Sequence, residues 1–446
     1  MENTYSSLRN AFLDFKKENS ENYFFAASLL VLLTIPLPYA LNSIALGIFF
    51  LASLFSLRKH KPAFNTEHIL PICLYLLMAA SLFWSIDQRA TLKALPKEVS
   101  LAAVPLAFIL FGRLAKEKLA SLFKFYSYGI LCFGIFYLVK AIARYLASSD
   151  TSVFFYHELV TKDVNAIHVS VYMALAFFFF FTKTGKRLPD YLAMAVLLLL
   201  VFLLSSKNII VVFILLIIFY YSFYTKASKR MRIRNLLFFI LFLVSLTFVG
   251  KIKERFLIEF YSNTADSTVN DVISKGDDKV YNVSISQAWN NKTFQQNDFF
   301  PGTAFRVYQF RIFTEIIKEE DAFLTGLGLN ASYPKIKEKA FHYNIFTGNA
   351  ETDNEGYQNK NFHNQYIQNF AELGVFGFII LIGMLFLTIR NALNKKDFIH
   401  LAFGILMISL FLTESFLWRQ RGVIFFTMFY CLFNSNTALK AEIKTA

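Results

Sequence analysis

The chain has 446 residues, of which 56% are apolar and only 17% are charged, and it contains 54 Phe. This composition excludes a water-soluble globule and predicts a polytopic membrane protein. The formal net charge of +14 would favour nucleic-acid binding in a soluble protein, but the basic residues here fall mostly in short loops between apolar runs. Membrane orientation explains this charge, so we expect no nucleic-acid partner.

About twelve apolar runs are long enough to be membrane spans, because a helix needs about 20 mostly apolar residues to cross ~30 Å of hydrocarbon. The runs are continuous rather than alternating, so only helices fit them. We therefore predict an all-α polytopic fold. The predicted spans are 22–38, 40–57, 69–86, 97–112, 122–144, 166–182, 190–205, 208–224, 235–250, 372–389, 398–413 and 422–434.

Every second loop between the predicted spans is rich in Lys and Arg, which places these loops and both termini in the cytoplasm by the positive-inside rule. The remaining loops share the outer face. The predicted divisions are a cytoplasmic segment 1–21, transmembrane helices 1–9 in 22–250, a large periplasmic loop 251–363, a surface helix with transmembrane helices 10–12 in 364–434, and a cytoplasmic tail 435–446.

No metal site or cofactor site is predicted. Cys73, Cys132 and Cys431 lie in separate apolar runs without a near partner in sequence. The chain has no glycine-rich phosphate loop, no zinc-protease motif, no serine-hydrolase elbow and no spaced acidic cluster. Without a metal, an anionic leaving group would have to be neutralised by arginine and lysine.

Residues 361–377 join the large loop to the following span. His363, Tyr366 and Phe370 have the spacing of one helix face, so we predict a surface helix with His363 at its start. Gly374 allows a turn before the span. A histidine in this place is either a polar residue with a satisfied partner or a proton-transfer group, since its unperturbed pKa of about 6.5 is near neutral pH.

The large loop contains one strong helical pattern. Between Phe305 and Glu320 the apolar residues at 305, 308, 312 and 316 form one stripe, and Gly326-Leu-Gly328 is expected to end the pattern. The preceding stretch 262–300 is rich in Ser, Asn, Asp, Thr and Lys and has no sustained periodicity. We predict that it is mobile.

Two arginines on this predicted helix have different neighbours. Arg311 stands four residues before Glu315, which predicts an ordinary ion pair on a solvated face. Arg306 is in register with Phe310 and other apolar residues. Such an arginine either covers the apolar residues with its stem or points into a protected site, and the residues alone leave both interpretations open.

Several ionisable residues stand at the outer ends of spans, where the positive-inside rule does not call for a cation. Such groups are costly unless they are paired or hydrated, so we predict that they share an anionic ligand in one outer cavity. Snorkelling to lipid phosphate is the alternative for the two in the fifth span, and the glutamate is expected to pair with a nearby arginine. The residues are Lys140, Arg144, Lys207, Glu414, Arg419 and Arg421.

The order of these features resembles the O-antigen ligase and polymerase superfamily over most of the chain. The resemblance depends on three segments. They are Arg306-x-x-x-Phe310 followed by Gly326-Leu-Gly328, His363-Asn-Gln-Tyr with Glu372-Leu-Gly-Val-Phe-Gly377, and Thr413-Glu-Ser with Arg-Gln-Arg-Gly422. The chain departs from the family at Phe310, where tryptophan is common, and at Lys207, where many members have arginine. A lysine keeps the charge but loses the bidentate fork.

The resemblance implies a metal-independent membrane glycosyltransferase with a GT-C-like fold, which works at the periplasmic face of the bacterial inner membrane. The donor would be a glycan on undecaprenyl diphosphate and the acceptor lipid A-core or another glycan. By resemblance, His363 would be the base toward the acceptor hydroxyl or a diphosphate ligand, and Arg306 would bind the diphosphate. Lys207, Arg419 and Arg421 would help to stabilise the leaving group, and attack opposite to it would invert the anomeric centre.

Three functions remain open at this point. Ligation to lipid A-core comes first, because the histidine and arginine motifs are its better-known marks, and polymerisation of repeat units needs the same donor chemistry. A transporter of lipid-linked glycans also uses about twelve spans, but such proteins often show related halves. The two halves of this chain look unlike each other.

Overall fold

The computed structural model is almost entirely helical, as predicted for an all-α membrane protein. Two short parallel strand pairs complete it. The residues that the structure describes are 23–57, 61–112, 114–162, 164–204, 206–225, 280–348 and 356–435, together with 13, 228–231, 233, 234, 237, 240 and the strand 437–438.

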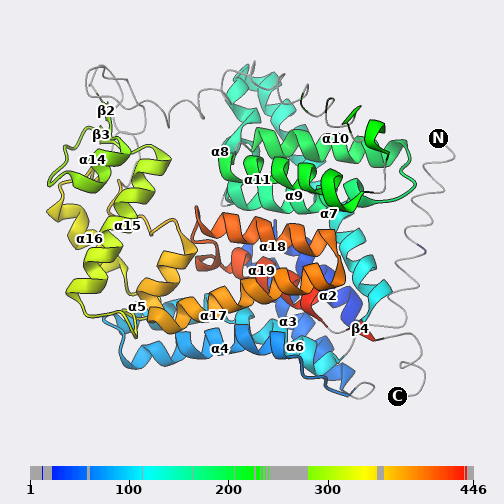
Figure 1. Cartoon of the computed structure of the whole chain (residues 1–446), viewed down its shortest axis with the longest axis horizontal. Coiled ribbons are helices and arrows are strands. Elements are labelled where there is room, and N and C mark those ends of the chain that lie inside the picture. Colours follow the sequence, from blue (N-terminus) through cyan, green and yellow to red (C-terminus); the bar gives the residue numbers. More distant parts are fainter. Residues whose placement is uncertain are drawn as a thin grey trace.

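The long helices lie side by side along the longest axis of the molecule, and α14, α15 and α16 gather at one end (Figure 1). We call the long helices the bundle. Its helices and helical turns are α2 (Tyr23–Thr34), α3 (Tyr39–Ser56), α4 (Thr66–Ala80), η1 (Ser81–Phe83), α5 (Gln88–Glu98), α6 (Ser100–Phe111), α7 (Lys116–Ser148), η2 (Thr151–Phe154), α8 (Tyr156–Leu159), α9 (Ala166–Thr182), α10 (Leu188–Leu203), α11 (Lys207–Phe219), η3 (Tyr220–Tyr224), α17 (Gln365–Lys395), α18 (Phe398–Phe411), η5 (Phe416–Trp418) and α19 (Gln420–Asn434).

Each predicted span except 235–250 overlaps a described helix, and 235–250 falls mostly outside the described residues. Within the described part of the chain, six helices are long and apolar enough to cross a membrane, and four shorter apolar helices accompany them. The six are Tyr39–Ser56, Thr66–Phe83, Gln88–Phe111, Lys116–Ser148, Lys207–Tyr224 and Gln365–Lys395.

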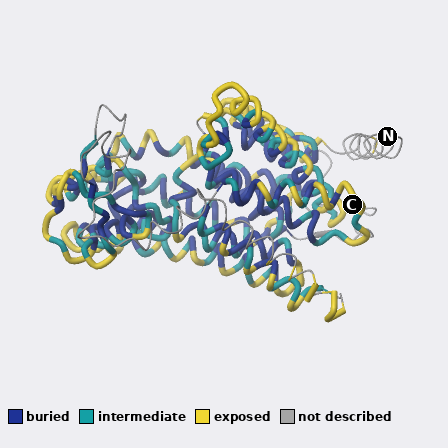
Figure 2. Tube along the Cα trace, turned by 90° about the horizontal axis from the view of Figure 1, so that it is seen from above, coloured by how far each residue is buried: buried dark blue, intermediate teal, exposed yellow. Residues whose placement is uncertain are grey.

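The helices of the bundle differ in how many of their apolar side chains are buried, and this depends on their position. Helix α9 packs against α7, α10, α11 and α18, and all of its residues except Ile167, Phe179 and Thr182 are buried. An all-round apolar helix is the pattern expected for such a central position. Helix α7 instead exposes apolar side chains such as Phe136 and Val139, as a lipid-facing helix does. Figure 2 shows the buried residues in the interior and the exposed ones at the rims.

The described part of the predicted large loop forms a small helical domain, which we call the loop unit (residues 280–348 and 356–364). It has its own hydrophobic core. Its elements are β2 (Tyr281–Asn282) paired in parallel with β3 (Asp298–Phe299), α14 (Ile285–Asn290), α15 (Gly302–Glu319) and α16 (Tyr333–His342). In the bundle, β1 (Leu114–Ala115) pairs in parallel with β4 (Thr437–Ala438).

The predicted stripe on α15 is confirmed, because the residues at 305, 308, 312 and 316 are all buried in the core of the loop unit. Helix α15 ends at Glu319, which agrees with the helical pattern predicted between Phe305 and Glu320 and leaves Gly326 and Gly328 beyond its end. The prediction that 262–300 is mobile is wrong where the structure describes this stretch. Residues 280–300 form two strands and a helix with buried Phe294 and Phe300, so the predicted mobile segment does not include them. The rest of that segment, 262–279, lies outside the described residues.

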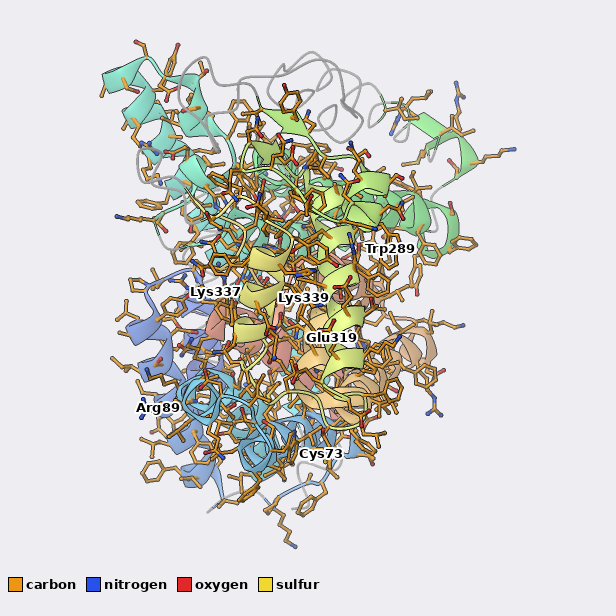
Figure 3. The ribbon with its side chains drawn as sticks, turned by 90° about the vertical axis from the view of Figure 1, so that its left-hand side faces the viewer. Cys73, Arg89, Trp289, Glu319, Lys337 and Lys339 are labelled. Atoms are coloured by element: carbon orange, nitrogen blue, oxygen red, sulfur yellow. The ribbon has the colours of Figure 1, made fainter. Side chains whose placement is uncertain are left out.

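The predicted ion pair between Arg311 and Glu315 is confirmed at 3.1 Å, but the face is not solvated. The Arg311 side chain is only 13% exposed, and its guanidinium lies 4.3 Å from the centre of the Tyr343 ring. Lys339 of α16 reaches Glu315 at 3.0 Å and Glu319 at 2.7 Å. These contacts fasten α16 to α15, and Figure 3 shows Lys339 and Glu319 on the two neighbouring helices.

The loop unit is fixed to the bundle where α17 breaks its helical geometry. Gly374 lies inside α17 with φ +63° and ψ −163°, which frees backbone groups of the helix for outside partners. The N–H groups of Leu327 and Gly328 donate to the carbonyls of Ala371 and Glu372, both at 2.9 Å. We call residues 323–329 the strap. The strap also accepts a hydrogen bond of 3.0 Å from the backbone of Ile86 through the Leu327 carbonyl, so it lies between two parts of the bundle.

Replacing either glycine of this junction with alanine is expected to loosen the loop unit. A Cβ at Gly374 would lie 2.1 Å from the Leu324 carbonyl oxygen, and one at Gly326 (φ +68°) would lie 2.4 Å from the backbone of Leu373. The left-handed conformation alone costs an alanine about 1–2 kcal/mol, so Gly326→Ala and Gly374→Ala should lower the unfolding temperature of the full chain in detergent.

Gly47→Ala is the matched control, because a Cβ there meets nothing within 4 Å. Unfolding temperatures that are equal in all three variants would show that the strap does not need the two glycines.

The stability of the loop unit is expected to depend on the ionisation of Glu315. Burial raises the pKa of this carboxyl, but hydrogen bonds from Tyr343 and Lys339 outweigh burial and hold the pKa below its ordinary value of 4.5. A lowered folded-state pKa means stability that is present above the unfolded-state pKa and is lost as the pH falls through the folded-state value. The parent chain should therefore lose thermal stability as the pH falls below the ordinary glutamate value of 4.5 and through the lower folded-state value.

Glu315→Gln should be less stable at neutral pH and should change less over this acidic range. Glu338→Gln is the comparison, because its side chain is 67% exposed. The same acid sensitivity in the Glu315 variant and the parent would remove this carboxylate from the explanation.

Candidate active site

His363 lies in the short connection that enters α17. It does not belong to the helix, contrary to the sequence prediction, because α17 begins at Gln365. The side chain of Asn364 accepts a hydrogen bond of 3.1 Å from the N–H of Ile367 and so caps the first turn. His363 itself has φ +47°, a left-handed conformation that is uncommon for a residue with a side chain. Its N–H donates to the side-chain oxygen of Asn361 at 3.0 Å, which supports this conformation.

Arg306 extends from the first turns of α15 toward the connection between α18 and α19. We call that connection, residues 412–419, the last connection. Nε and Nη2 of Arg306 donate to the Thr413 carbonyl at 3.1 and 2.6 Å, and Nη1 donates to the Gly302 carbonyl at 2.9 Å. The sequence left open whether Arg306 covers the apolar residues with its stem or points into a protected site. In the structure its guanidinium points away from the apolar residues. Phe310 stacks on Trp289 instead.

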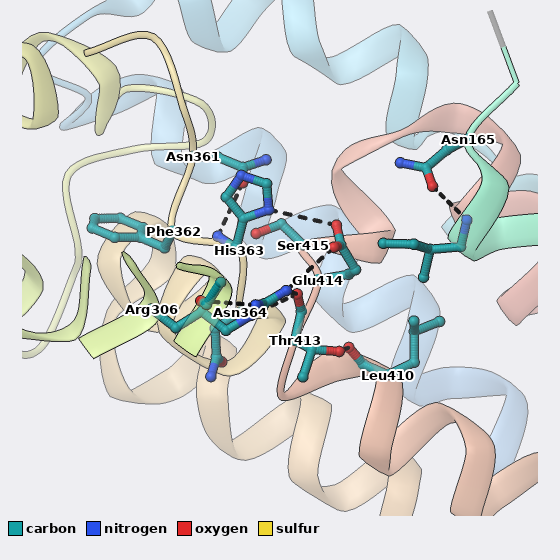
Figure 4. Close-up of polar contacts among 12 residues, drawn as sticks. Asn165, Arg306, Asn361, Phe362, His363, Asn364, Leu410, Thr413, Glu414 and Ser415 are labelled. Atoms are coloured by element: carbon teal, nitrogen blue, oxygen red, sulfur yellow. Dashed lines mark hydrogen bonds and ion pairs between the residues drawn. The ribbon is translucent and has the colours of Figure 1, made fainter. Parts of the chain in front are cut away.

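Glu414 lies between these two side chains (Figure 4). Its Oε1 is 3.6 Å from Nη2 of Arg306 and its Oε2 is 3.6 Å from Nδ1 of His363. The Glu414 side chain is 12% exposed, whereas those of Arg306 and His363 are 32% and 30% exposed. Both distances are too long for hydrogen bonds but are within ion-pair range. The sequence predicted a nearby arginine as the partner of Glu414, and the structure gives it Arg306 from a distant part of the chain.

The turn that contains Lys207 lies against the same connection. Lys207 is the first residue of α11, and the side-chain amide of the next residue, Asn208, donates to the Ser409 carbonyl at 2.6 Å and to the Thr413 hydroxyl at 2.9 Å. Asn208 is not among the site residues predicted from the sequence. The signal was an amide side chain at the start of an otherwise apolar run, where it needs a partner.

Two further contacts hold the last connection in place beyond Glu414. The side chain of Gln365 accepts a hydrogen bond of 2.7 Å from the N–H of Leu417, and the indole N–H of Trp418 donates to Asn330 of the loop unit at 2.7 Å. The last connection is therefore held by the start of α17 and by the loop unit, and Glu414 has a fixed position between them.

Arg419 and Arg421 lie near the other end of the last connection, at a different cavity of about 500 Å³. Neither His363 nor Arg306 lines this cavity. Arg421 is buried, with Nε and Nη2 donating to the Leu37 carbonyl at 3.2 and 2.9 Å. Arg419 and Arg421 therefore line a cavity to which the histidine does not belong.

Lys140 and Arg144 are also engaged elsewhere. Lys140 donates to the Val160 carbonyl. Arg144 donates to the Glu158 carbonyl at 2.7 Å and forms an ion pair of 2.6 Å with the Glu158 carboxylate. These contacts tie α7 to the segment before α9. They give both cations a structural reason to stand at this end of the bundle, in place of the shared ligand that the sequence predicted.

The group formed by His363, Arg306 and Glu414 can combine proton transfer with anion binding. If the Nδ1 proton of His363 faces Glu414, the lone pair is on Nε2, which can then accept a proton from a substrate hydroxyl. Arg306 uses three N–H groups on carbonyls, and a guanidinium has five. Among the described residues, no group of three or more His, Cys, Asp or Glu could hold a metal ion.

Comparison with protein families gives a match to the O-antigen ligase family over residues 192–382. The matched range runs from α10 to α17 and includes Lys207, Arg306 and His363, while Glu414 follows it. No curated protein matches the chain in a sequence search. Residues 192–382 of this multi-pass helical membrane protein are therefore similar to the O-antigen ligase family.

Proposed function

We propose that the chain is an O-antigen ligase-like glycosyltransferase. It moves a glycan from undecaprenyl diphosphate to a lipid A-core acceptor at the periplasmic face of the bacterial inner membrane. The observation that carries the proposal is the approach of His363 and Arg306 to one carboxylate, that of Glu414, each at 3.6 Å. The family match, which includes the first two residues, supports the same reaction class.

The proposed topology has about twelve spans in a GT-C-like arrangement, with both termini in the cytoplasm. The overlap of the predicted spans with described helices supports it, and so does the alternation of basic loops along the chain. In this topology the loop unit, the last connection and the turn at Lys207 all face the periplasm. Lipid-linked donor and acceptor would then reach the site from the outer leaflet.

In the proposed reaction the acceptor hydroxyl attacks the anomeric carbon of the donor glycan, and His363 Nε2 takes the hydroxyl proton. The bond from the anomeric carbon to the diphosphate oxygen breaks, and the diphosphate leaves with the electron pair. Arg306 stabilises the charge that develops on this leaving group, with Lys207 as a further cation at the adjoining turn. The reaction inverts the anomeric centre and needs no metal.

Glu414 acts in this mechanism as a positioning residue. Facing Nδ1 of His363, it selects the tautomer with Nε2 free and stabilises the imidazolium that forms, as a carboxylate does in hydrolase triads. Facing Arg306, it holds the guanidinium toward the site. Both functions depend on the same carboxylate, so its loss affects base and anion binder together.

His363→Ala and Arg306→Ala are expected to lower glycan transfer by at least about a hundredfold, the usual contribution of a general base or of a charge-stabilising donor. Arg306→Lys should recover little activity, because lysine keeps the charge but loses the fork that binds two oxygens. The measurement is transfer of glycan from carrier lipid to lipid A-core by the purified full chain.

His342→Ala and Arg89→Ala are the matched controls, because both side chains are exposed on other elements. Each variant is also checked for accumulation and for unfolding temperature, since Arg306 links α15 to the last connection. Variants of His363 and Arg306 that are folded and fully active would refute the proposed chemistry.

Ligation and polymerisation are separated by the glycans that accumulate when the gene is deleted. Loss of a ligase should leave long chains on the carrier lipid, whereas loss of a polymerase should leave single repeat units on lipid A-core. We expect long carrier-linked chains, analysed by electrophoresis of the lipid fraction and of lipopolysaccharide. Single repeats on lipid A-core would instead identify the reaction as polymerisation, with the same donor chemistry.

A further inference from the structure

A second site is formed by the cavity at the end of the bundle that carries Arg419. Its volume is about 500 Å³, and it combines a cationic part with an aromatic part. None of the lining residues that the structure describes is acidic. The lining residues are Pro36, Leu37, Pro38, Tyr39, Phe133, Phe136, Tyr137, Thr161, Lys162, Val164, Arg419 and Arg421.

Three cations line this cavity, one of them buried in its wall and two of them exposed. Arg421 is a fixed part of the wall, because it donates to the Leu37 carbonyl and its guanidinium lies 4.0 Å from the centre of the Tyr39 ring. Lys162 and Arg419 are exposed. Within the described part of the chain, their side chains form no hydrogen bond and no ion pair. The Leu37 carbonyl does not itself neutralise the Arg421 guanidinium, and Lys162 and Arg419 add two further positive charges at the cavity.

Two helices add to this positive potential. Helix α3 begins at Tyr39 and helix α19 begins at Gln420, directly beside lining residues of the cavity. The N-terminus of a helix carries a partial positive charge and unpaired N–H groups. The cationic side chains and the helix ends therefore favour an anion at the same place.

The aromatic part of the cavity continues onto the apolar surface of α7. Phe133 and Phe136 line it, and Phe136 is 52% exposed on the same helix as the exposed Val139. An exposed apolar surface on a spanning helix faces lipid. A ligand in the cavity could therefore place its charged end at Arg419 and extend an apolar chain along Phe136 into the bilayer.

We propose that this cavity binds the phosphate head group of a membrane lipid, with Lys162 and Arg419 as the phosphate ligands and with the hydrocarbon chain lying along Phe136. Phosphate is the anion that combines with an apolar chain in membrane lipids, and charge-assisted bonds to lysine and arginine are its usual protein contacts. The site is separate from the group at Glu414 and does not depend on the transfer reaction proposed there.

Binding of a matched pair of short-chain lipids to the purified full chain tests this site. Dioctanoyl phosphatidic acid carries a phosphate, and dioctanoylglycerol has the same chains without it. We expect the phosphatidic acid to bind more tightly by calorimetry in a non-ionic detergent. Arg419→Gln and Lys162→Gln should each weaken its binding about tenfold, because each removes one charge-assisted contact.

Arg89→Gln is the control, since it removes an exposed arginine that does not line the cavity. His363→Ala should bind the phosphatidic acid like the parent chain, so that failure of the transfer mechanism and failure of this site remain distinguishable. Equal binding of the two lipids, or full affinity in both cavity variants, would overturn the proposal.

Competition then identifies which lipid supplies the phosphate. A polyprenyl diphosphate, a phosphorylated lipid A and phosphatidylglycerol are each used to displace the bound phosphatidic acid. Tightest displacement by lipid A would identify an acceptor site, by polyprenyl diphosphate a carrier site, and by phosphatidylglycerol a site for bulk lipid. Each of these results supports a lipid-phosphate site, whereas displacement by dioctanoylglycerol alone contradicts it.

Discussion

The break in α17 at Gly374 is the constraint on which the candidate site depends. A continuous helix would use its own carbonyls, but the break leaves those of Ala371 and Glu372 to accept the N–H groups of the strap. The strap connects α15 to α16, so its fixed position sets where α15 lies on the bundle. With α15 in this place, Arg306 reaches the Thr413 carbonyl. A local backbone requirement for glycine therefore determines the position of a side chain far away in sequence.

One carboxylate then organises the charges of the site. Glu414 is largely buried and faces both Arg306 and His363. A buried carboxylate is costly without partners, and here both partners come from segments that the strap and the first turn of α17 hold in position. The left-handed conformation of His363 is part of the same arrangement, because the side chain of Asn361 supports it and the cap at Asn364 begins the helix directly afterwards.

Much of the fold could be predicted from the sequence, because hydrophobic runs and basic loops report directly on membrane spans. The apolar stripe on α15 and the ion pair between Arg311 and Glu315 could also be predicted, because each depends on residues that are only a few helical turns apart. The start of α17 after His363 could not be predicted. The apolar spacing continues through His363, but the side-chain amide of Asn364 caps the helix and so sets its first turn. The partner of Glu414 could not be predicted either. It is Arg306, which lies 108 positions away in the chain, and hydrophobic periodicity does not encode such a contact.

The partners of the cations at the end of the bundle near Arg419 could not be predicted from the sequence either. Because these partners differ, the cations contribute differently to the local charge. Arg144 is paired with a carboxylate and adds little net charge. Lys140 and Arg421 donate to neutral carbonyls, and a carbonyl does not itself cancel the charge of its donor. At the candidate active site Glu414 offsets part of the charge of Arg306, so a ligand with a single charge gains less there than a diphosphate. The described lining of the cavity at Arg419 contains no acidic residue, and a single phosphate is enough to complement it. The two proposed anion sites at this end of the bundle would therefore differ in strength and favour ligands of different charge.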